Sequence, residues 1–174
     1  TYAYWGEPDS TLHLYGVGSP EANSVIKSLN DSLAKGLKGM KDDTLVIVTA
    51  DHGHQNVINT KLYEYKDLYA MLERMPSNEG RSLTFKVKKE FHQQFKVKFE
   101  HYDLYSKDDF LKLGFLGDIN KFGYNQRLDD FLGDFIAIAS NELYLEYVDF
   151  KDDAFHFKSA HAGITKNEME TPLI

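Results

Sequence analysis

The stretch Thr44-Leu-Val-Ile-Val-Thr-Ala-Asp51-His52-Gly53-His54 places two potential metal ligands directly after an apolar, β-branched run. A run of this composition is typical of a strand that is covered on both faces of a sheet. Adjacent strand residues point to opposite faces, so Asp51 and His52 can serve one ion only if the chain bends there. Gly53 permits such a bend. We therefore expect residues 44–50 to form a buried strand that carries Asp51 and His52 at its carboxyl end.

A helix is expected before this strand. Ser19-Pro20-Glu21 combines an N-cap, a proline at the first helical position and an acid in the first turn. Apolar residues then recur at four-residue spacing from Val25 to Leu37, which predicts a helix over about 20–39 with one buried stripe. The aromatic segment 2–5 indicates an earlier strand. Strand, helix and strand in this order imply a parallel crossover.

A second carboxylate and imidazole pair lies near the start of the chain, in Asp9-Ser-Thr-Leu-His13. Four-residue spacing lets both side chains face the same way in a loop or in the first turn of a helix. Ligands of open α/β sheets gather at the carboxyl ends of strands, and Asp9 and Asp51 both follow predicted strands. We expect the two acids to be neighbours. The alternative is that Asp9 is a surface acid, Asp51 caps a turn and His52 packs against the sheet.

Two further histidines belong to these segments. His161 lies in Ser159-Ala-His161-Ala-Gly163, where small residues would let a metal ion or a substrate approach closely. A lone histidine is more often structural, so its meaning depends on the other motifs. His54 is expected to face solvent from a loop, and the alternative is a place beside the substrate or behind the ligands.

The middle of the chain has a looser pattern. A helix is predicted near 66–75, and strands are predicted at 83–87 and 133–139. Phe91, Phe95 and Phe99 recur every four residues, which favours a second amphipathic helix whose phenylalanines belong to the core. The segment 106–109 resembles a capping box that opens another short helix.

Composition narrows the classes of protein and partner. The chain has 174 residues, 42% hydrophobic and 27% charged, which suits a single globular domain over residues 1–174. Its net charge of −7 argues against long nucleic acid as a partner. A small phosphorylated substrate stays open, because bound metal can supply local positive charge. Cysteine is absent, so metal binding must use histidine and carboxylate. No membrane span or signal peptide is expected.

Three motifs occur in one order: Glu-Pro-Asp-Ser-x-x-His over residues 7–13, Asp-His-Gly at 51–53, and His-x-Gly-x-Thr at 161–165. This combination resembles the alkaline phosphatase superfamily, and more closely its type I phosphodiesterase/nucleotide pyrophosphatase branch. The resemblance implies an α/β, alkaline phosphatase-like fold with a central, mostly parallel sheet flanked by helices. It also implies that the chain is the C-terminal portion of such a catalytic domain, truncated at the N-terminal side.

The resemblance implies roles for particular residues. Asp9, His13 and His161 correspond to the three protein ligands of one divalent ion, and Asp51 and His52 to two ligands of another. Zinc is the expected metal, with manganese next. The family's Ser or Thr nucleophile and a further aspartate belong upstream of this chain and have no counterpart here. We therefore assign no catalytic residue and expect this chain alone to be inactive.

The resulting functional hypothesis is a metal-dependent phosphoester hydrolase that cleaves phosphodiester or pyrophosphate bonds in a small substrate through a two-metal site. Phosphomonoesterase and phosphonate hydrolase activities are alternatives within the superfamily. A non-catalytic metal-binding module is an alternative of another class. An unpaired sheet edge and uncovered apolar surface would also favour self-association.

Overall fold

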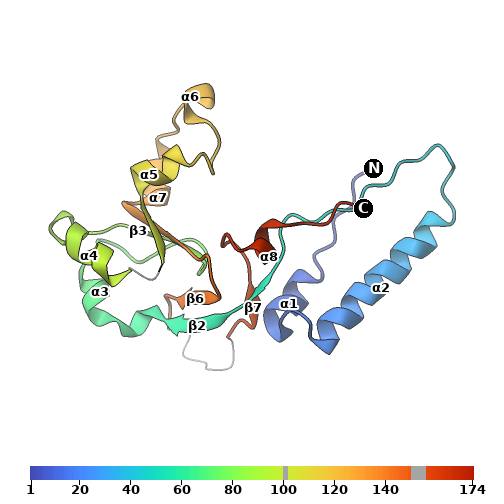
Figure 1. Cartoon of the computed structure of the whole chain (residues 1–174), viewed down its shortest axis with the longest axis horizontal. Coiled ribbons are helices and arrows are strands. Elements are labelled where there is room, and N and C mark those ends of the chain that lie inside the picture. The colour runs from blue at the N-terminus through green and yellow to red at the C-terminus, as the bar shows by residue number, and fades with distance from the viewer. Residues whose placement is uncertain (100–101, 150–155) are drawn as a thin grey trace. The chain divides into compact units, whose positions relative to one another are not determined.

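The computed structural model describes residues 1–99, 102–149 and 156–174 of this mixed α/β protein (Figure 1). The chain divides into two compact units. Unit 1 consists of residues 1–58, 152–161 and 165–174, and unit 2 consists of residues 59–151 and 162–164. No helix within the described ranges is long and apolar enough to cross a bilayer.

The described residues of unit 1 form three helices and one short strand pair. Its elements are α1 (Asp9–Tyr15), α2 (Pro20–Leu37), β1 (Gln55–Asn56), β7 (Ser159–Ala160) and α8 (Lys166–Met169). The two strands are antiparallel, with Gln55 opposite Ala160 and Asn56 opposite Ser159. Helix α1 packs against both α2 and β7, so it lies beside a strand that is distant in the sequence (Figure 1).

Helix α2 confirms the predicted helix, with a slightly earlier end. Ser19 is its N-cap, and the Ser19 hydroxyl accepts a hydrogen bond from the Ala22 amide at 3.1 Å. Ala22 is its buried residue, whereas the expected stripe is half-buried at Val25 and exposed at Leu37. The helix therefore covers less apolar surface than its spacing predicted.

The predicted strands at 2–5 and 44–50 are wrong. Neither segment forms a ladder, and residues 44–50 make one isolated bridge, from Thr49 to Leu173. Leu45 and Ile47 are 84% and 63% exposed, so the run is not covered on both faces. A strand needs hydrogen-bonded neighbours along its length, whereas this run pairs with the chain's last residues only locally, through two backbone hydrogen bonds between Val48 and Ile174 at 2.9 and 3.0 Å. The expected parallel crossover between these segments is therefore not formed.

Unit 2 is built around an antiparallel sheet in the order β3-β5-β4, and β2 pairs with β6 elsewhere in the unit. Its strands are β2 (Ile58–Lys61), β3 (Ser82–Phe85), β4 (Asp103–Ser106), β5 (Phe135–Ile138) and β6 (Leu143–Glu146). Its helices are η1 (Leu62–Glu64), α3 (Lys66–Ala70), η2 (Lys89–Phe91), α4 (His92–Lys98), α5 (Lys107–Lys112), α6 (Ile119–Phe122) and α7 (Arg127–Leu132). The predicted strands at 83–87 and 133–139 correspond to β3 and β5, and the helix predicted at 66–75 is the shorter α3.

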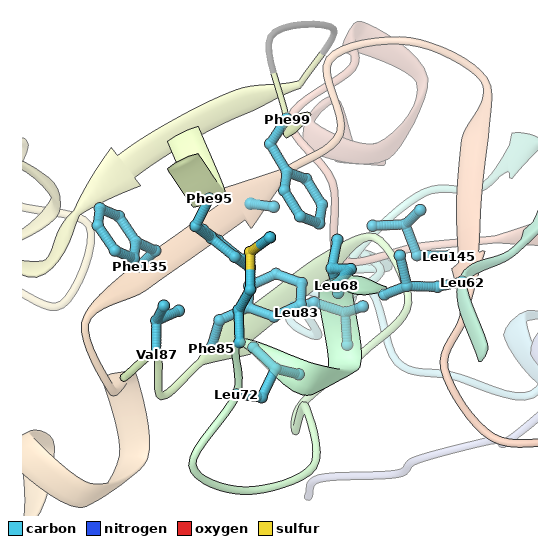
Figure 2. Close-up of a cluster of buried hydrophobic side chains, with 12 residues drawn as sticks. Leu62, Leu68, Leu72, Leu83, Phe85, Val87, Phe95, Phe99, Phe135 and Leu145 are labelled. Carbon is cyan, nitrogen blue, oxygen red and sulfur yellow. The ribbon is translucent and has the colours of Figure 1, made fainter. Parts of the chain in front are cut away.

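The core of unit 2 contains packed phenylalanine rings among aliphatic side chains, and Phe95 and Phe99 belong to it as their spacing predicted. Phe95 and Phe99 are 0% and 2% exposed, and their rings lie 4.8 Å apart. Phe85 and Phe135 complete the cluster at ring distances of 5.1 and 5.4 Å from Phe95 (Figure 2). Ser106 caps α5 by accepting the Asp109 amide at 3.2 Å, which confirms the predicted cap.

The buried residues of unit 1 differ in type from those in the core of unit 2. Among its described residues, the buried positions are Gly16, Ala22, His54, Ser159, Ala160 and Glu168. None of these is a large apolar side chain. The buried positions of unit 1 are therefore small or polar, and the polar ones are held by hydrogen bonds.

Replacing Phe95 with alanine should lower the free energy of unfolding by about 3–5 kcal/mol, because it leaves a cavity among three other rings. Urea unfolding followed by far-UV circular dichroism measures the change. Phe122→Ala is the control, since Phe122 is 75% exposed and should change stability by no more than about 0.5 kcal/mol. Equal losses in the two variants would contradict this core.

Candidate functional site

Helix α1 presents Asp9 and His13 on one face. Before its first turn, the Glu7 carboxylate accepts hydrogen bonds from the Thr11 amide at 3.2 Å and from the Thr11 hydroxyl at 2.8 Å. This contact satisfies an N–H group that has no partner within the helix. Asp9 and His13 are one turn apart, and the Nε2 atom of His13 lies 3.5 Å from Oδ1 of Asp9. The prediction that Asp9 and His13 face the same way is confirmed.

The loop that carries Asp51 and His52 is shaped by close contact with α8. The Gly53 amide donates to the Glu168 carbonyl at 2.8 Å, and a Cβ atom at Gly53 would lie 2.0 Å from the Asn167 carbonyl oxygen. Glu168 is buried because its carboxylate accepts from the Thr165 hydroxyl at 2.6 Å in a capping box. Gly53 is therefore needed for a close backbone approach, and its φ is not in the left-handed region.

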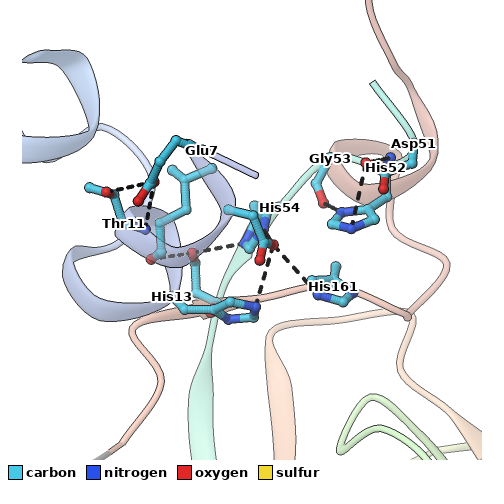
Figure 3. A network of polar contacts seen from close by, with 11 residues as sticks. Glu7, Thr11, His13, Asp51, His52, Gly53, His54 and His161 are labelled. Atoms are coloured by element: carbon cyan, nitrogen blue, oxygen red, sulfur yellow. Dashed lines mark hydrogen bonds and ion pairs between the residues drawn. The ribbon is translucent and has the colours of Figure 1, made fainter. Parts of the chain in front are cut away.

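Three histidines converge on one oxygen of Asp9. The Nε2 atoms of His54, His13 and His161 lie 2.8, 3.5 and 3.7 Å from Oδ1 of Asp9 (Figure 3). The His52 ring stacks on the His161 ring with centroids 3.9 Å apart. Ligand atoms from Asp9, His52, His54 and His161 all lie within 4.8 Å of one another. This is a donor set of the kind that binds zinc and related divalent ions.

Hydrogen bonds behind two of the imidazoles determine which nitrogen faces the cluster. Nδ1 of His13 lies 2.9 Å from the Ser159 carbonyl, and Nδ1 of His52 lies 3.0 Å from the Gly53 carbonyl. A carbonyl oxygen only accepts, so each Nδ1 must carry the proton and leave Nε2 with its lone pair. Metal-binding histidines are commonly oriented in this way.

The two most central groups are biased toward their metal-binding forms. Burial raises the pKa of Asp9, but the hydrogen bond from His54 and the nearby imidazoles outweigh burial and hold this pKa below its usual value. Burial lowers the pKa of His54, although the hydrogen bond to Asp9 opposes the shift. An ionised carboxylate and a neutral imidazole are the forms that coordinate a metal ion.

Comparison with known proteins gives the chain a family. A model of the type I phosphodiesterase/nucleotide pyrophosphatase family matches residues 1–162. The chain belongs to this family. The match confirms the resemblance inferred from the three motifs. The chain has the fold of the alkaline phosphatase superfamily.

Solved structures agree on the fold. Murine ectonucleotide pyrophosphatase/phosphodiesterase 5 is similar with a TM-score of 0.66 at 20% identity, over 98% of this chain and 45% of that chain. An inactive form of the murine protein in complex with AMP has a TM-score of 0.64 at 20% identity, with the same coverage of both chains. Phosphonoacetate hydrolase from Sinorhizobium meliloti, in complex with phosphonoacetate, gives 0.62 at 19% identity, over 94% of this chain and 43% of that chain. This chain thus spans less than half the length of these proteins.

The structure brings together only part of the predicted site. Asp9, His13 and His161 meet at one carboxylate oxygen. Asp51 is outside the group around Asp9, and its side chain is 66% exposed, with Oδ1 3.8 Å from Nε2 of His52.

The expected solvent-facing position of His54 is wrong, because the His54 side chain is 4% exposed. Ser159 was not identified from the sequence at all, although its carbonyl and hydroxyl contact His13 and His54. The signal that could have found both residues is the pairing of β1 with β7, which places residues 54 and 159 together. No local sequence pattern indicates that β1 pairs with β7.

Replacing Gly53 with alanine should destabilise the protein by about 1–3 kcal/mol, because the new methyl group would collide with backbone that has little room to move. Gly36→Ala is the matched control. A Cβ atom at Gly36 meets nothing within 4 Å, and alanine inside α2 should stabilise the protein by about 0.5–1 kcal/mol. Thermal unfolding of the two variants measures both changes, and a neutral Gly53→Ala variant would contradict the close approach.

Proposed function

We propose that this chain is part of a metal-dependent phosphoester hydrolase of the phosphodiesterase/nucleotide pyrophosphatase type. The observation that carries the proposal is the convergence of three imidazole nitrogens on Oδ1 of Asp9. Membership of the family supports the same reaction class. We further propose that residues 1–174 form part of one catalytic domain, since similar solved proteins are more than twice as long.

We propose two divalent ions in the complete enzyme, by analogy with the family; the donor atoms of Asp9, His52, His54 and His161, which all lie within 4.8 Å of one another, support at least one of them. We assign Asp9, His13 and His161 to one ion, and Asp51 and His52 to the other. Zinc fits a set made of imidazole and carboxylate groups, and manganese is the second choice. Paired ions of this kind lower the pKa of a nucleophilic hydroxyl and offset charge on the leaving oxygen.

The protein's own side chains have a positioning role in this scheme. The Ser159 and Gly53 carbonyls orient the imidazoles of His13 and His52, so that Nε2 of each ring faces outward for an ion. The nucleophile is expected in sequence outside residues 1–174. This chain by itself should therefore bind metal without turning over substrate.

Proteins of similar fold support a small phosphorylated molecule as the substrate. A small phosphorylated molecule suits a family that includes a protein crystallised with AMP. Phosphonate hydrolysis is a second candidate, because phosphonoacetate hydrolase has a similar fold. A phosphomonoesterase would use the same donor set. Self-association is also proposed, and the exposed side chains of Leu45 and Ile47 support it.

Zinc binding tests the first ion. Calorimetric titration of the metal-free chain should show about one tightly bound ion. His161→Ala should weaken this binding by roughly 100-fold or more, since even residues behind the ligands contribute about 10–100-fold. His92→Ala is the control, because His92 contacts the Val87 carbonyl in unit 2 and should leave binding unchanged. Equal affinity in all three proteins would contradict the assignment.

Substrate preference tests the reaction class. The complete protein, with its upstream segment, should hydrolyse a bis-aryl phosphate faster than a mono-aryl phosphate or phosphonoacetate, and a chelator should abolish this turnover. Residues 1–174 alone should be inactive under the same conditions. Faster cleavage of phosphonoacetate would favour the second candidate, and no turnover with zinc or manganese would exclude all these activities.

A further inference from the structure

His54 has contacts that the family-based assignment does not use. Its side chain is 4% exposed, and its Nε2 atom lies 2.8 Å from Oδ1 of Asp9. The corresponding separations for His13 and His161 are 3.5 and 3.7 Å. The imidazole nearest to the central carboxylate is therefore the one that has no assigned role.

The hydrogen bonds of Ser159 determine how His54 is protonated. The Ser159 hydroxyl donates its only proton to the Leu12 carbonyl at 2.7 Å. The same oxygen lies 3.2 Å from Nδ1 of His54, so it can only accept there and Nδ1 must carry a proton. Without a metal ion, the hydrogen bond from Nε2 of His54 to Asp9 therefore requires a second proton on this ring. When His54 is neutral, its Nε2 lone pair faces the Asp9 carboxylate instead. Two acceptors face each other favourably only across a cation, which is either a proton or a metal ion.

We propose that His54 is a direct ligand of the ion bound by Asp9, which would give that ion four protein ligands: Asp9, His13, His54 and His161. The inference rests on the proposed function. Catalytic zinc sites usually have three protein ligands and leave a fourth position for water. In this protein the neutral imidazole of His54 would hold that fourth position.

His52 is the competing candidate for the fourth position, since its ring stacks on that of His161 and one of its ligand atoms lies within 4.8 Å of those of Asp9, His54 and His161. Two contacts assign His52 to the other ion instead. Its Nδ1 is held by the Gly53 carbonyl, and its Nε2 lies 3.8 Å from Oδ1 of Asp51. The shortest contact to Asp9 belongs to His54. His54 is therefore the better fourth ligand for the Asp9 ion.

Zinc X-ray absorption on the chain loaded with one equivalent of zinc tests the proposal without relying on activity. The wild-type spectrum should fit three imidazoles and a carboxylate at about 2.0–2.2 Å. His54→Gln should lose one imidazole and bind zinc at least about tenfold more weakly. A fit with two imidazoles in the wild type would overturn the proposal even if His54→Gln failed to fold.

Ser159→Ala separates coordination from positioning. This variant keeps His54 but removes the acceptor for Nδ1, so it should weaken zinc binding by about 10–100-fold while the imidazole count stays at three. An unchanged imidazole count in folded His54→Gln would show that His54 only positions Asp9, and the proposal would fail.

The proposed function would fail in a different way. In that case His161→Ala would bind zinc as tightly as the wild type, or the wild type would bind none. His92→Gln should match the wild type in affinity and in imidazole count, because His92 lies in unit 2.

Discussion

The arrangement of the site depends on the hydrogen bonds of Ser159. Its hydroxyl donates to the Leu12 carbonyl of α1 and accepts from His54, while its carbonyl accepts from His13. The side chain is fully buried, so these contacts have no competition from water. One small residue thereby sets the position of α1 and the orientation of two imidazoles around Asp9. The β1–β7 pair brings this residue to the site, since Ser159 lies opposite Asn56.

The features that could be predicted from the sequence are those that depend on near neighbours in the chain. The spacing of Asp9 and His13 predicted their shared face, because one helical turn separates them. Ser19 and Ser106 were identifiable as caps from the residues that follow them, and the phenylalanine spacing predicted the core of unit 2. The order of the three motifs identified the family.

The predictions that were wrong concern features that depend on residues far away in the sequence. Residues 44–50 have the composition of a central strand, but composition does not supply the neighbouring strands that a ladder requires. His54 was wrongly predicted to face solvent because its burial depends on β7, which lies about a hundred residues later in the chain. The burial of the Ser159 hydroxyl could not be predicted either, since serine is common at surfaces and no sequence spacing distinguishes this serine. Local patterns therefore found the candidate ligands but not the contacts that orient them.

The polar interior of unit 1 has a thermodynamic consequence. Heat-capacity change and denaturant sensitivity on unfolding both scale with newly exposed surface, and apolar surface dominates the heat-capacity term. A unit whose described buried positions are small or polar should therefore unfold with a shallow urea dependence and a small heat-capacity change. The residues around Asp9 come from segments far apart in the chain, so the unfolded state cannot hold an ion in the same way. If the proposed site binds zinc, free zinc at a hundred times its dissociation constant would add about 2.7 kcal/mol to the stability of this unit.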